Sequence, residues 1–302
     1  MVPQIALSKN GPSCSRLVHG LWRLAGWNHS PWQIRATIDF CLERGITTFD
    51  HADIYGDYTC EQLFGAGLAT AAIDRSRIQI VTKCGIKLVS PNRPSYRIKS
   101  YDTSCSHILA SVDNSLKCLH TDYIDVLLIH RPDPLTDPDE INKAFTTLRD
   151  NGKVRHFGVS NFVPSQFELL ASRLEVPLVT NQIEYSVIHL AAHGDGTIDL
   201  CQKLGIRPMA WSPLGGGRLF RQDSEQAQAV RETLSDIGRQ IGGASIDLVA
   251  LAWILRHPAQ FAVVLGTGNT SRISQAIEAL DIELSREQWF EVWRASMGRD
   301  VP

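Results

Sequence analysis

Short apolar runs recur along the chain, and longer segments with an apolar residue at every third or fourth position separate them. Most of the runs are apolar throughout instead of alternating with polar residues, which is typical of parallel strands that are buried on both faces. The pattern therefore predicts a central parallel sheet. Its predicted strands cover residues 17–19, 47–49, 78–82, 126–129, 157–159, 178–180, 207–210 and 261–265.

The segments between these runs carry the signals of helix starts, faces and ends. Ser30 and Pro31 place a capping side chain before a proline in the first turn, and Gly45 follows the predicted helix end. Residues 104–119 carry a stripe of apolar side chains at helical spacing. Other helices are predicted over residues 137–152, 164–174, 198–204 and 270–280.

Eight strands, each followed by a helix, predict an α/β fold of the (β/α)8 TIM-barrel type, which takes about 250 residues. An N-terminal β-hairpin, with strands at 5–7 and 14–16, precedes the first barrel strand. Extra helices are predicted after strand seven, over 224–240 and 244–257, and at the C-terminus over 285–298. Because no Pro-, Gly- or Ser-rich linker interrupts the chain, we expect a single domain over residues 1–302.

Composition and charge narrow the function classes. Of the 302 residues, 43% are hydrophobic, and the net charge of −2 provides no field that attracts nucleic acid or an anionic membrane. The longest apolar run, 248–255, is far shorter than the roughly 20 residues of a membrane-spanning helix, and the N-terminus lacks the pattern of a signal peptide. The seven cysteines are scattered without a Cys-x-x-Cys pair, which favours reduced thiols in the cytoplasm.

Polar side chains stand where the predicted strands end. Strand two ends in Asp50, its following loop holds Tyr55, strand three ends in Lys83 and strand four ends in His130. Neighbouring strands lie about 4.8 Å apart, so these three strand ends span about 10 Å at the rim where TIM barrels carry their active sites. We therefore expect a carboxylate, a phenol, an ammonium and an imidazole to lie close together.

These four groups suit proton transfer to an oxygen atom. A free tyrosine has a pKa of about 10, which is high for proton exchange near neutrality, and a nearby protonated lysine lowers it. Asp50 can hold Lys83 charged, and His130 can hydrogen-bond a carbonyl oxygen and orient it. None of the four supplies a hydride, so a reduction at this site needs a cofactor.

Four segments, in order along nearly the whole chain, resemble the aldo-keto reductase family in its bacterial oxidoreductase branch. They are 49–56 with Glu61 and Gly65, 81–83, 122–130 and 153–162. The resemblance implies hydride transfer between a nicotinamide cofactor and a small-molecule aldehyde or ketone. It also implies Tyr55 as the proton donor, Lys83 and Asp50 as the residues that tune it, and His130 as the residue that orients the carbonyl.

The same resemblance implies a set of cofactor-binding residues. Ser160, Asn161 and Gln182 resemble the residues that hold the nicotinamide carboxamide, and Trp211 takes the place of the aromatic residue that stacks on its ring. The segment 212–218 is similar to the pyrophosphate loop, and 266–275 to the adenosine-phosphate site. The full set is Gly20, Leu21, Trp22, Ser160, Asn161, Gln182, Trp211, Ser212, Leu214, Gly215, Gly216, Arg218, Gly266, Thr267, Gly268, Arg272 and Gln275.

One departure from the family pattern bears on the choice of cofactor. Many members have a basic residue where this chain has Gly266, but Arg272 remains and can pair with a 2′-phosphate. We therefore expect NADPH, with NADH as the alternative. The sequence contains no intact Gly-x-Gly-x-x-Gly motif, which argues against a Rossmann fold.

Other functions stay open on the same residues. Lys83 could form a Schiff base, as in barrel aldolases, and His130 could be an ordinary buried histidine. A metal site is disfavoured because the adjacent acids and histidine at 50, 51 and 53 would not all point in one direction. A cofactor-binding sensor or regulatory subunit with little turnover is the alternative from another class.

Overall fold

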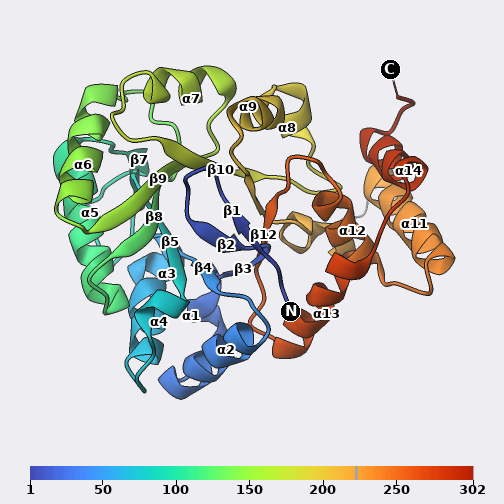
Figure 1. The fold of residues 1–302 in the computed structure, drawn as a ribbon, viewed down its shortest axis with the longest axis horizontal. Coiled ribbons are helices and arrows are strands. Elements are labelled where there is room, and N and C mark those ends of the chain that lie inside the picture. Colours follow the sequence, from blue (N-terminus) through green and yellow to red (C-terminus); the bar gives the residue numbers. More distant parts are fainter. Residues whose placement is uncertain (222–223, 302) are drawn as a thin grey trace.

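Within residues 1–221 and 224–301, which the computed structural model describes, eight parallel strands close into a barrel (Figure 1). Each strand pairs with the barrel strands before and after it in the chain, and the last pairs with the first. The predicted (β/α)8 barrel is therefore confirmed, and every strand overlaps its predicted run. The strands are β3 (Leu17–Gly20), β4 (Thr48–Asp50), β5 (Gln79–Cys84), β8 (Ile124–Ile129), β9 (Val154–Ser160), β10 (Leu178–Glu184), β11 (Met209–Trp211) and β12 (Ala262–Leu265).

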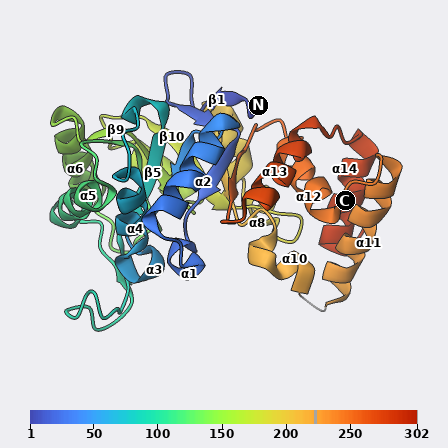
Figure 2. The same cartoon turned by 90° about the horizontal axis from the view of Figure 1, so that it is seen from below.

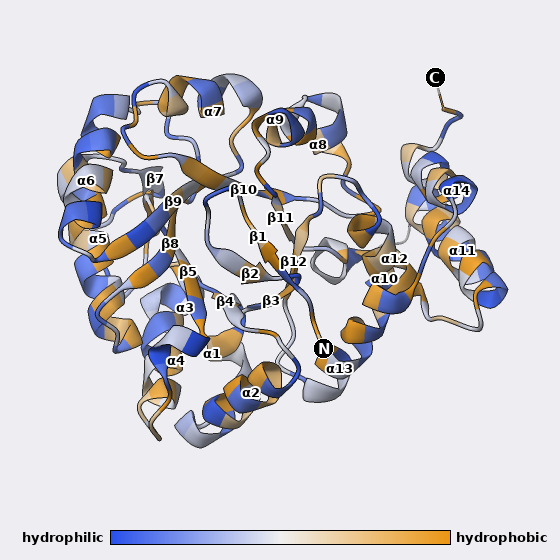
Figure 3. Cartoon of the chain, viewed as in Figure 1, coloured by the Kyte–Doolittle hydropathy of each residue, from blue (hydrophilic) through white to orange (hydrophobic). Residues whose placement is uncertain are grey.

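Helices cover the outside of the barrel between successive strands, and Figure 3 shows hydrophobic and hydrophilic stretches alternating along α2, α5 and α6. The helix predicted from Ser30 begins as expected. Its N-terminus is a capping box, in which Gln33 N donates to Ser30 Oγ at 3.3 Å and Ser30 N donates to Gln33 Oε1 at 2.8 Å. These outer helices are α2 (Pro31–Glu43), α4 (Cys60–Leu68), α5 (Cys105–Leu119), α6 (Pro138–Asp150), α7 (Pro164–Ala171), α9 (Thr197–Leu204) and α13 (Thr270–Glu278).

The N-terminal hairpin closes one end of the barrel. Strands β1 (Gln4–Ala6) and β2 (Ser13–Ser15) pair antiparallel, as predicted. They place Leu7 and Cys14 against the apolar side chains of the barrel interior. Figure 2 shows the hairpin at one end of the molecule and the short helices α1 (Leu24–Trp27) and α3 (Tyr55–Tyr58) at the other. The site therefore has to lie at the end that α1 and α3 flank.

The extra helices predicted after strand seven and at the C-terminus lie beside the barrel (Figures 1 and 2). They are α11 (Glu225–Gln240), α12 (Ile246–Leu255) and α14 (Arg286–Met297). Residues 248–254 of α12 are all buried, because this helix packs against β12 on one side and α11 on the other. Trp253 of α12 and Trp289 of α14 stack at 4.8 Å, and each indole N–H donates to the carbonyl of the other residue.

Several small elements were not predicted, because each is too short to show a period. The strands β6 (Ile86–Lys87) and β7 (Ser100–Tyr101) pair antiparallel and enclose a loop over residues 88–99. The other short elements are α8 (Ala191–Gly194), α10 (Arg218–Arg221), η1 (Arg75–Arg77), η2 (Gly215–Gly217) and η3 (Ala279–Asp281).

Among the described residues, no helix is both long enough and apolar enough to cross a membrane.

Candidate active site

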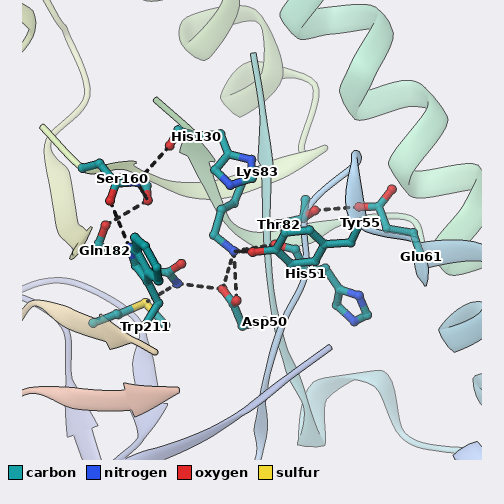
Figure 4. A network of polar contacts seen from close by, with 12 residues as sticks. Asp50, His51, Tyr55, Glu61, Thr82, Lys83, His130, Ser160, Gln182 and Trp211 are labelled. Atoms are coloured by element: carbon teal, nitrogen blue, oxygen red, sulfur yellow. Dashed lines mark hydrogen bonds and ion pairs between the residues drawn. The ribbon is translucent and has the colours of Figure 1, made fainter. Parts of the chain in front are cut away.

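Lys83 is the centre of a polar network at the barrel rim (Figure 4). Its ammonium Nζ lies 2.8 and 2.9 Å from the two carboxylate oxygens of Asp50, 2.7 Å from the carbonyl oxygen of His51 and 3.2 Å from the Tyr55 hydroxyl. Asp50 is the last residue of β4, Lys83 lies in β5, and Tyr55 opens α3. The structure therefore brings together three of the side chains that the strand ends predicted.

The fourth, His130, follows β8 directly and stands beside Tyr55. The two rings are 5.9 Å apart between centroids and lie nearly perpendicular, at 79°. His130 Nδ1 is buried and has no hydrogen-bond partner among the described residues. Burial, together with the positive charges of Lys83 and Arg131, holds the pKa of His130 well below its ordinary value. The imidazole is therefore neutral near pH 7, and a neutral imidazole can both donate and accept a hydrogen bond.

Burial changes the expected electrostatics of Tyr55. The sequence analysis predicted that Lys83 would lower the pKa of this phenol. Lys83 does act in that direction, but burial outweighs it, and the pKa of Tyr55 lies above its ordinary value. Burial alone would lower the pKa of Lys83, but Asp50 and Tyr55 more than offset it, so the ammonium stays charged. The effect of Lys83 thus has the predicted direction, but the net pKa of Tyr55 is raised and not lowered.

Four of the predicted cofactor residues form a continuous chain of hydrogen bonds that ends on the lysine network. Trp211 Nε1 donates to Asn161 Oδ1 at 3.0 Å, and Asn161 Nδ2 donates to Ser160 Oγ at 2.8 Å. Ser160 Oγ donates to the Gln182 carbonyl at 2.8 Å, and Gln182 Nε2 donates to Asp50 Oδ1 at 2.7 Å. The polar groups expected to hold a nicotinamide carboxamide thus adjoin the groups expected to handle the proton.

The segment after β11 lines an open hollow. Gly216, Gly217, Arg218 and Arg221 surround a volume of about 310 Å³. Gly216 and Gly217 have φ of 65° and 93°, which side chains rarely adopt, and glycine lets the backbone approach a ligand closely. Arg218 is not free, because its guanidinium lies 2.6 Å from Glu184. The rest of this segment includes Ser212, Leu214 and Gly215, and a Cβ on Gly215 would lie 2.3 Å from Ile188 Cδ1.

The segment after β12 lies beside the first barrel loop. Asn269 Oδ1 accepts from Arg272 N at 3.2 Å and so caps α13, whose first two turns carry Arg272 and Gln275. Gly266 and Thr267 precede this cap, and a Cβ on Gly268 would lie 2.5 Å from Trp27 Cδ2.

The predicted residues of the first loop differ in exposure. Gly20 ends β3 and packs closely on β12, where a Cβ would lie 2.7 Å from Val264 Cγ1. Leu21 is buried and Trp22 is 56% exposed. Packing alone accounts for the glycine at position 20 and for the apolar side chain of Leu21. Trp22, in contrast, presents its side chain to solvent.

Comparisons with known proteins agree with this geometry. The model of the aldo/keto reductase family matches residues 16–295. The chain belongs to the aldo/keto reductase family. It is 48% identical to oxidoreductase YdhF of Escherichia coli over the whole of both chains, and 46% identical to a 6-dehydroglucose reductase of Agrobacterium fabrum, over 95% of this chain and 96% of the relative. The crystal structure of the thermostable aldo-keto reductase Tm1743 superposes with a TM-score of 0.81 at 27% identity, covering 97% of this chain and 99% of the other.

These relationships identify this aldo/keto reductase as an oxidoreductase of the NAD(P)H-dependent carbonyl reductase class. Within the described residues, no group of three or more His, Cys, Asp or Glu side chains is arranged to hold a metal ion.

A second carboxyl group behind the lysine escaped the sequence analysis as a candidate for chemistry. Glu61 of α4 is buried and accepts a hydrogen bond from Thr82 Oγ1 at 2.6 Å, one residue from Lys83. Burial raises the pKa of Glu61 to about 7. Glu61 had drawn notice only as part of the family signature, because neither burial nor pKa can be read from a sequence.

The backbone after Tyr55 is unusual in this aldo/keto reductase. Gly56, Asp57 and Tyr58 follow one another with φ of 57°, 54° and 69°. A side chain other than glycine in this left-handed region costs about 1–2 kcal/mol, so Asp57 and Tyr58 must be held there by other contacts. No sequence signal indicated this strain, because only one of the three residues is a glycine.

Proposed function

We propose that this chain reduces aldehydes or ketones to alcohols with NADPH, and that Tyr55 donates the proton. The proposal depends on one observation, the position of Lys83 between Asp50 and Tyr55. The ammonium lies 2.8 Å from an Asp50 oxygen and 3.2 Å from the Tyr55 hydroxyl. A fixed positive charge at hydrogen-bond distance stabilises the phenolate that remains when Tyr55 gives up its proton.

Each side chain of the network then has a defined task. Tyr55 protonates the substrate oxygen as it becomes an alkoxide, and Lys83 compensates the negative charge that develops on the phenol. Asp50 and the His51 carbonyl hold the ammonium in place. The ring of His130 stands against that of Tyr55, so its imidazole lies near the oxygen that Tyr55 protonates. The neutral imidazole donates a hydrogen bond to this carbonyl oxygen and orients it. Bound NADPH supplies the hydride.

The donor set at this rim fits a nicotinamide dinucleotide. Ser160, Asn161 and Gln182 offer amide and hydroxyl groups next to the proton-transfer residues, and Trp211 adds an aromatic face. The hollow beside Gly216 and Gly217 has room for phosphate groups, and Arg221 lines it with a positive charge, while Arg218, on the same hollow, pairs with Glu184. Arg272 is exposed at the start of α13 and is our candidate for a 2′-phosphate contact, which favours NADPH over NADH.

The relatives suggest where to begin the search for a substrate. Two proteins that are 46% and 35% identical to this chain carry the name 6-dehydroglucose reductase. We therefore propose a hydroxylated, sugar-like aldehyde of this kind as the first candidate, to be tested within a panel of simple aldehydes and ketones.

The test compares the wild-type protein with Tyr55→Phe. Wild type should oxidise NADPH in the presence of a substrate of the panel, and loss of the proton donor should lower kcat by about 100-fold or more. Tyr101→Phe, on the exposed strand β7, is the matched control and should keep full activity. Titration with NADPH and NADH should give the lower Kd for NADPH, for wild type and Tyr55→Phe alike.

Two results would contradict this proposal. Equal turnover by wild type and Tyr55→Phe would show that another group donates the proton. Tight NADPH binding by the wild type without turnover of any carbonyl compound would favour a sensor or regulatory role.

A further inference from the structure

Tyr58 connects the segment that carries Tyr55 with the loop between β6 and β7. Its hydroxyl accepts a hydrogen bond from Leu88 N at 2.8 Å. Its ring lies 4.4 Å from the guanidinium carbon of Arg93 and 6.5 Å, edge to face, from the ring of Tyr96. Leu88, Arg93 and Tyr96 all belong to the 88–99 loop between β6 and β7, which extends away from the barrel in Figure 2.

The same loop makes a second contact with the strained backbone. Asn92 Nδ2 donates to the Asp57 carbonyl at 2.8 Å. Asp57 and Tyr58 are the two residues other than glycine that adopt left-handed φ values directly after Tyr55. Strained backbone of this kind persists only where surrounding contacts hold it, and the 88–99 loop supplies contacts of this kind in addition to the hydrogen bonds within the turn.

The position of the Tyr55 phenol depends on this backbone. Within the described residues, the only side-chain hydrogen bond of Tyr55 is the one with Lys83, at 3.2 Å. The short helix α3 begins at Tyr55, and its last residue is Tyr58. If residues 56–58 relaxed toward right-handed or extended values, the start of this turn would move and so would the phenol.

We propose that Tyr58 is a positioning residue, which ties the 88–99 loop to the 55–58 segment and so holds the Tyr55 hydroxyl against Lys83. The inference rests on the proposed role of Tyr55 as proton donor. Neither the loop nor Tyr58 touches the reacting atoms in this scheme, and Tyr58 acts through Tyr55.

The pH dependence of turnover separates positioning from a general loss of stability. Burial and Asp50 raise the pKa of Tyr55, whereas Lys83 and Arg131 lower it. A phenol that moves away from the Lys83 ammonium but stays buried loses the larger of the two lowering effects, so its pKa rises. In the reverse reaction, oxidation of an alcohol, the base is the phenolate, and its population should then rise only at higher pH. A merely structural defect would lower the amount of active protein without moving this limb of the profile.

The experiment uses the full chain with Tyr58→Phe and Asn92→Ala, and Tyr101→Phe as control. Tyr58→Phe keeps the ring but removes the hydroxyl that accepts from Leu88, and Asn92→Ala removes the second contact from an exposed position. Tyr101 lies in β7 at the end of the same loop, and within the described residues its side chain makes no hydrogen bond or ring contact. Limited trypsin digestion reports on the loop without any activity measurement, because the bonds after the exposed Arg97 and Lys99 flank Ile98, which is 71% exposed.

We expect faster cleavage after Arg97 and Lys99 in Tyr58→Phe and, to a smaller extent, in Asn92→Ala. In Tyr58→Phe, kcat should fall about 10-fold with an unchanged KM for NADPH, because a small misplacement of a reacting group is costly. The pH at which its rate of alcohol oxidation rises should be higher than in wild type. Tyr101→Phe should match wild type in every measurement.

Unchanged cleavage in Tyr58→Phe would show that the Tyr58 hydroxyl does not hold the 88–99 loop against the 55–58 segment. Faster cleavage with wild-type kcat and pH profile would overturn the positioning of Tyr55. Full turnover by Tyr55→Phe would instead overturn the proposed function, and that result is distinct because the cleavage assay does not depend on it.

Discussion

A lysine that is 1% exposed carries a full charge in this protein, and such a charge is tolerated only when it is paired and hydrogen-bonded. The sequence could predict the meeting of Lys83 with Asp50 and Tyr55, because parallel strands of a barrel end at one rim. It could not predict that Gln182 donates to Asp50 across the barrel, since that bond depends on side-chain orientation. It also could not show that burial outweighs Lys83 in setting the pKa of Tyr55.

Glu61 allows a test of buried electrostatics at the same scale. Its pKa is raised from 4.5 to about 7, so folding favours the protonated form. Its favourable contribution is therefore present below pH 4.5 and is lost as the pH rises through about 7. Glu61→Gln, which stays neutral, should gain stability relative to wild type as the pH rises from about 5 to about 8.

The measurement is urea unfolding of both proteins at several pH values across that range. Glu175→Gln is the control, because Glu175 is exposed and forms no ion pair within the described residues. Its unfolding is measured in parallel, so that the effect of losing one surface carboxylate is known. Parallel stability curves for Glu61→Gln and wild type would show that Glu61 is ionised in the fold throughout.

At the scale of elements, prediction succeeded where a period was long enough to read. The strand runs and the capped helix at Ser30 were predicted because burial on both faces and helix capping leave local signals. The start of β9 at Val154 was predicted three residues late, because Arg155 and His156 interrupt the apolar run. The pair β6 and β7 gave no signal at all, since each strand has two residues. These two strands bound the loop that contacts Tyr58, so the least predictable element lies next to the site.

The helix α4 had no predicted range, because Gly65 and Gly67 weaken its helical pattern. Gly65 is required by packing: a Cβ there would lie 2.1 Å from the Cys118 carbonyl oxygen of α5. Gly65→Ala should therefore lower the free energy of unfolding by about 1–3 kcal/mol, since backbone on both sides has to shift. Gly26→Ala in α1 meets no atom within 4 Å and should be neutral or stabilising by up to about 1 kcal/mol. Chemical denaturation of the two variants checks the pair, and an equal effect of both substitutions would show that α4 and α5 are not closely packed.

At the scale of the molecule, the three added helices extend the apolar core beyond the barrel. Tyr185 of the loop after β10 stacks on Phe261 at 4.6 Å and on Trp253 at 5.3 Å, which links the barrel to α12. The Tyr185 hydroxyl lies 2.7 Å from His193 Nε2, and His193 is 5.4 Å from His257 between ring centroids. This region was predicted as separate helices, but its joint packing depends on long-range contacts that no local pattern encodes.

Buried and partly buried histidines make the stability of the whole molecule sensitive to acid. Burial, reinforced by His29, lowers the pKa of His19 to about 4, and burial, reinforced by His193, lowers that of His257 to about 4. The neutral forms are therefore favoured in the fold. Their contribution is present above the ordinary histidine value of 6.5 and is lost as the pH falls toward 4, because the unfolded chain binds protons that the folded chain excludes. Glu61 and Asp53, whose pKa values burial raises, act in the opposite direction, but they are two groups against several histidines whose pKa values are lowered, including His51 and His130.

We therefore expect the free energy of unfolding to fall steadily from pH 6.5 toward pH 4, the window set by His19 and His257. Urea unfolding at intervals across this window measures the slope. His257→Asn should make the slope shallower, because it removes one titrating group while its amide oxygen can still accept the hydrogen bond that Ala259 N gives to His257 Nδ1 at 3.1 Å. A stability that is constant or rises between pH 6.5 and 4 would contradict this expectation, and an unchanged slope in His257→Asn would mean that His257 binds protons in the folded protein as readily as in the unfolded chain.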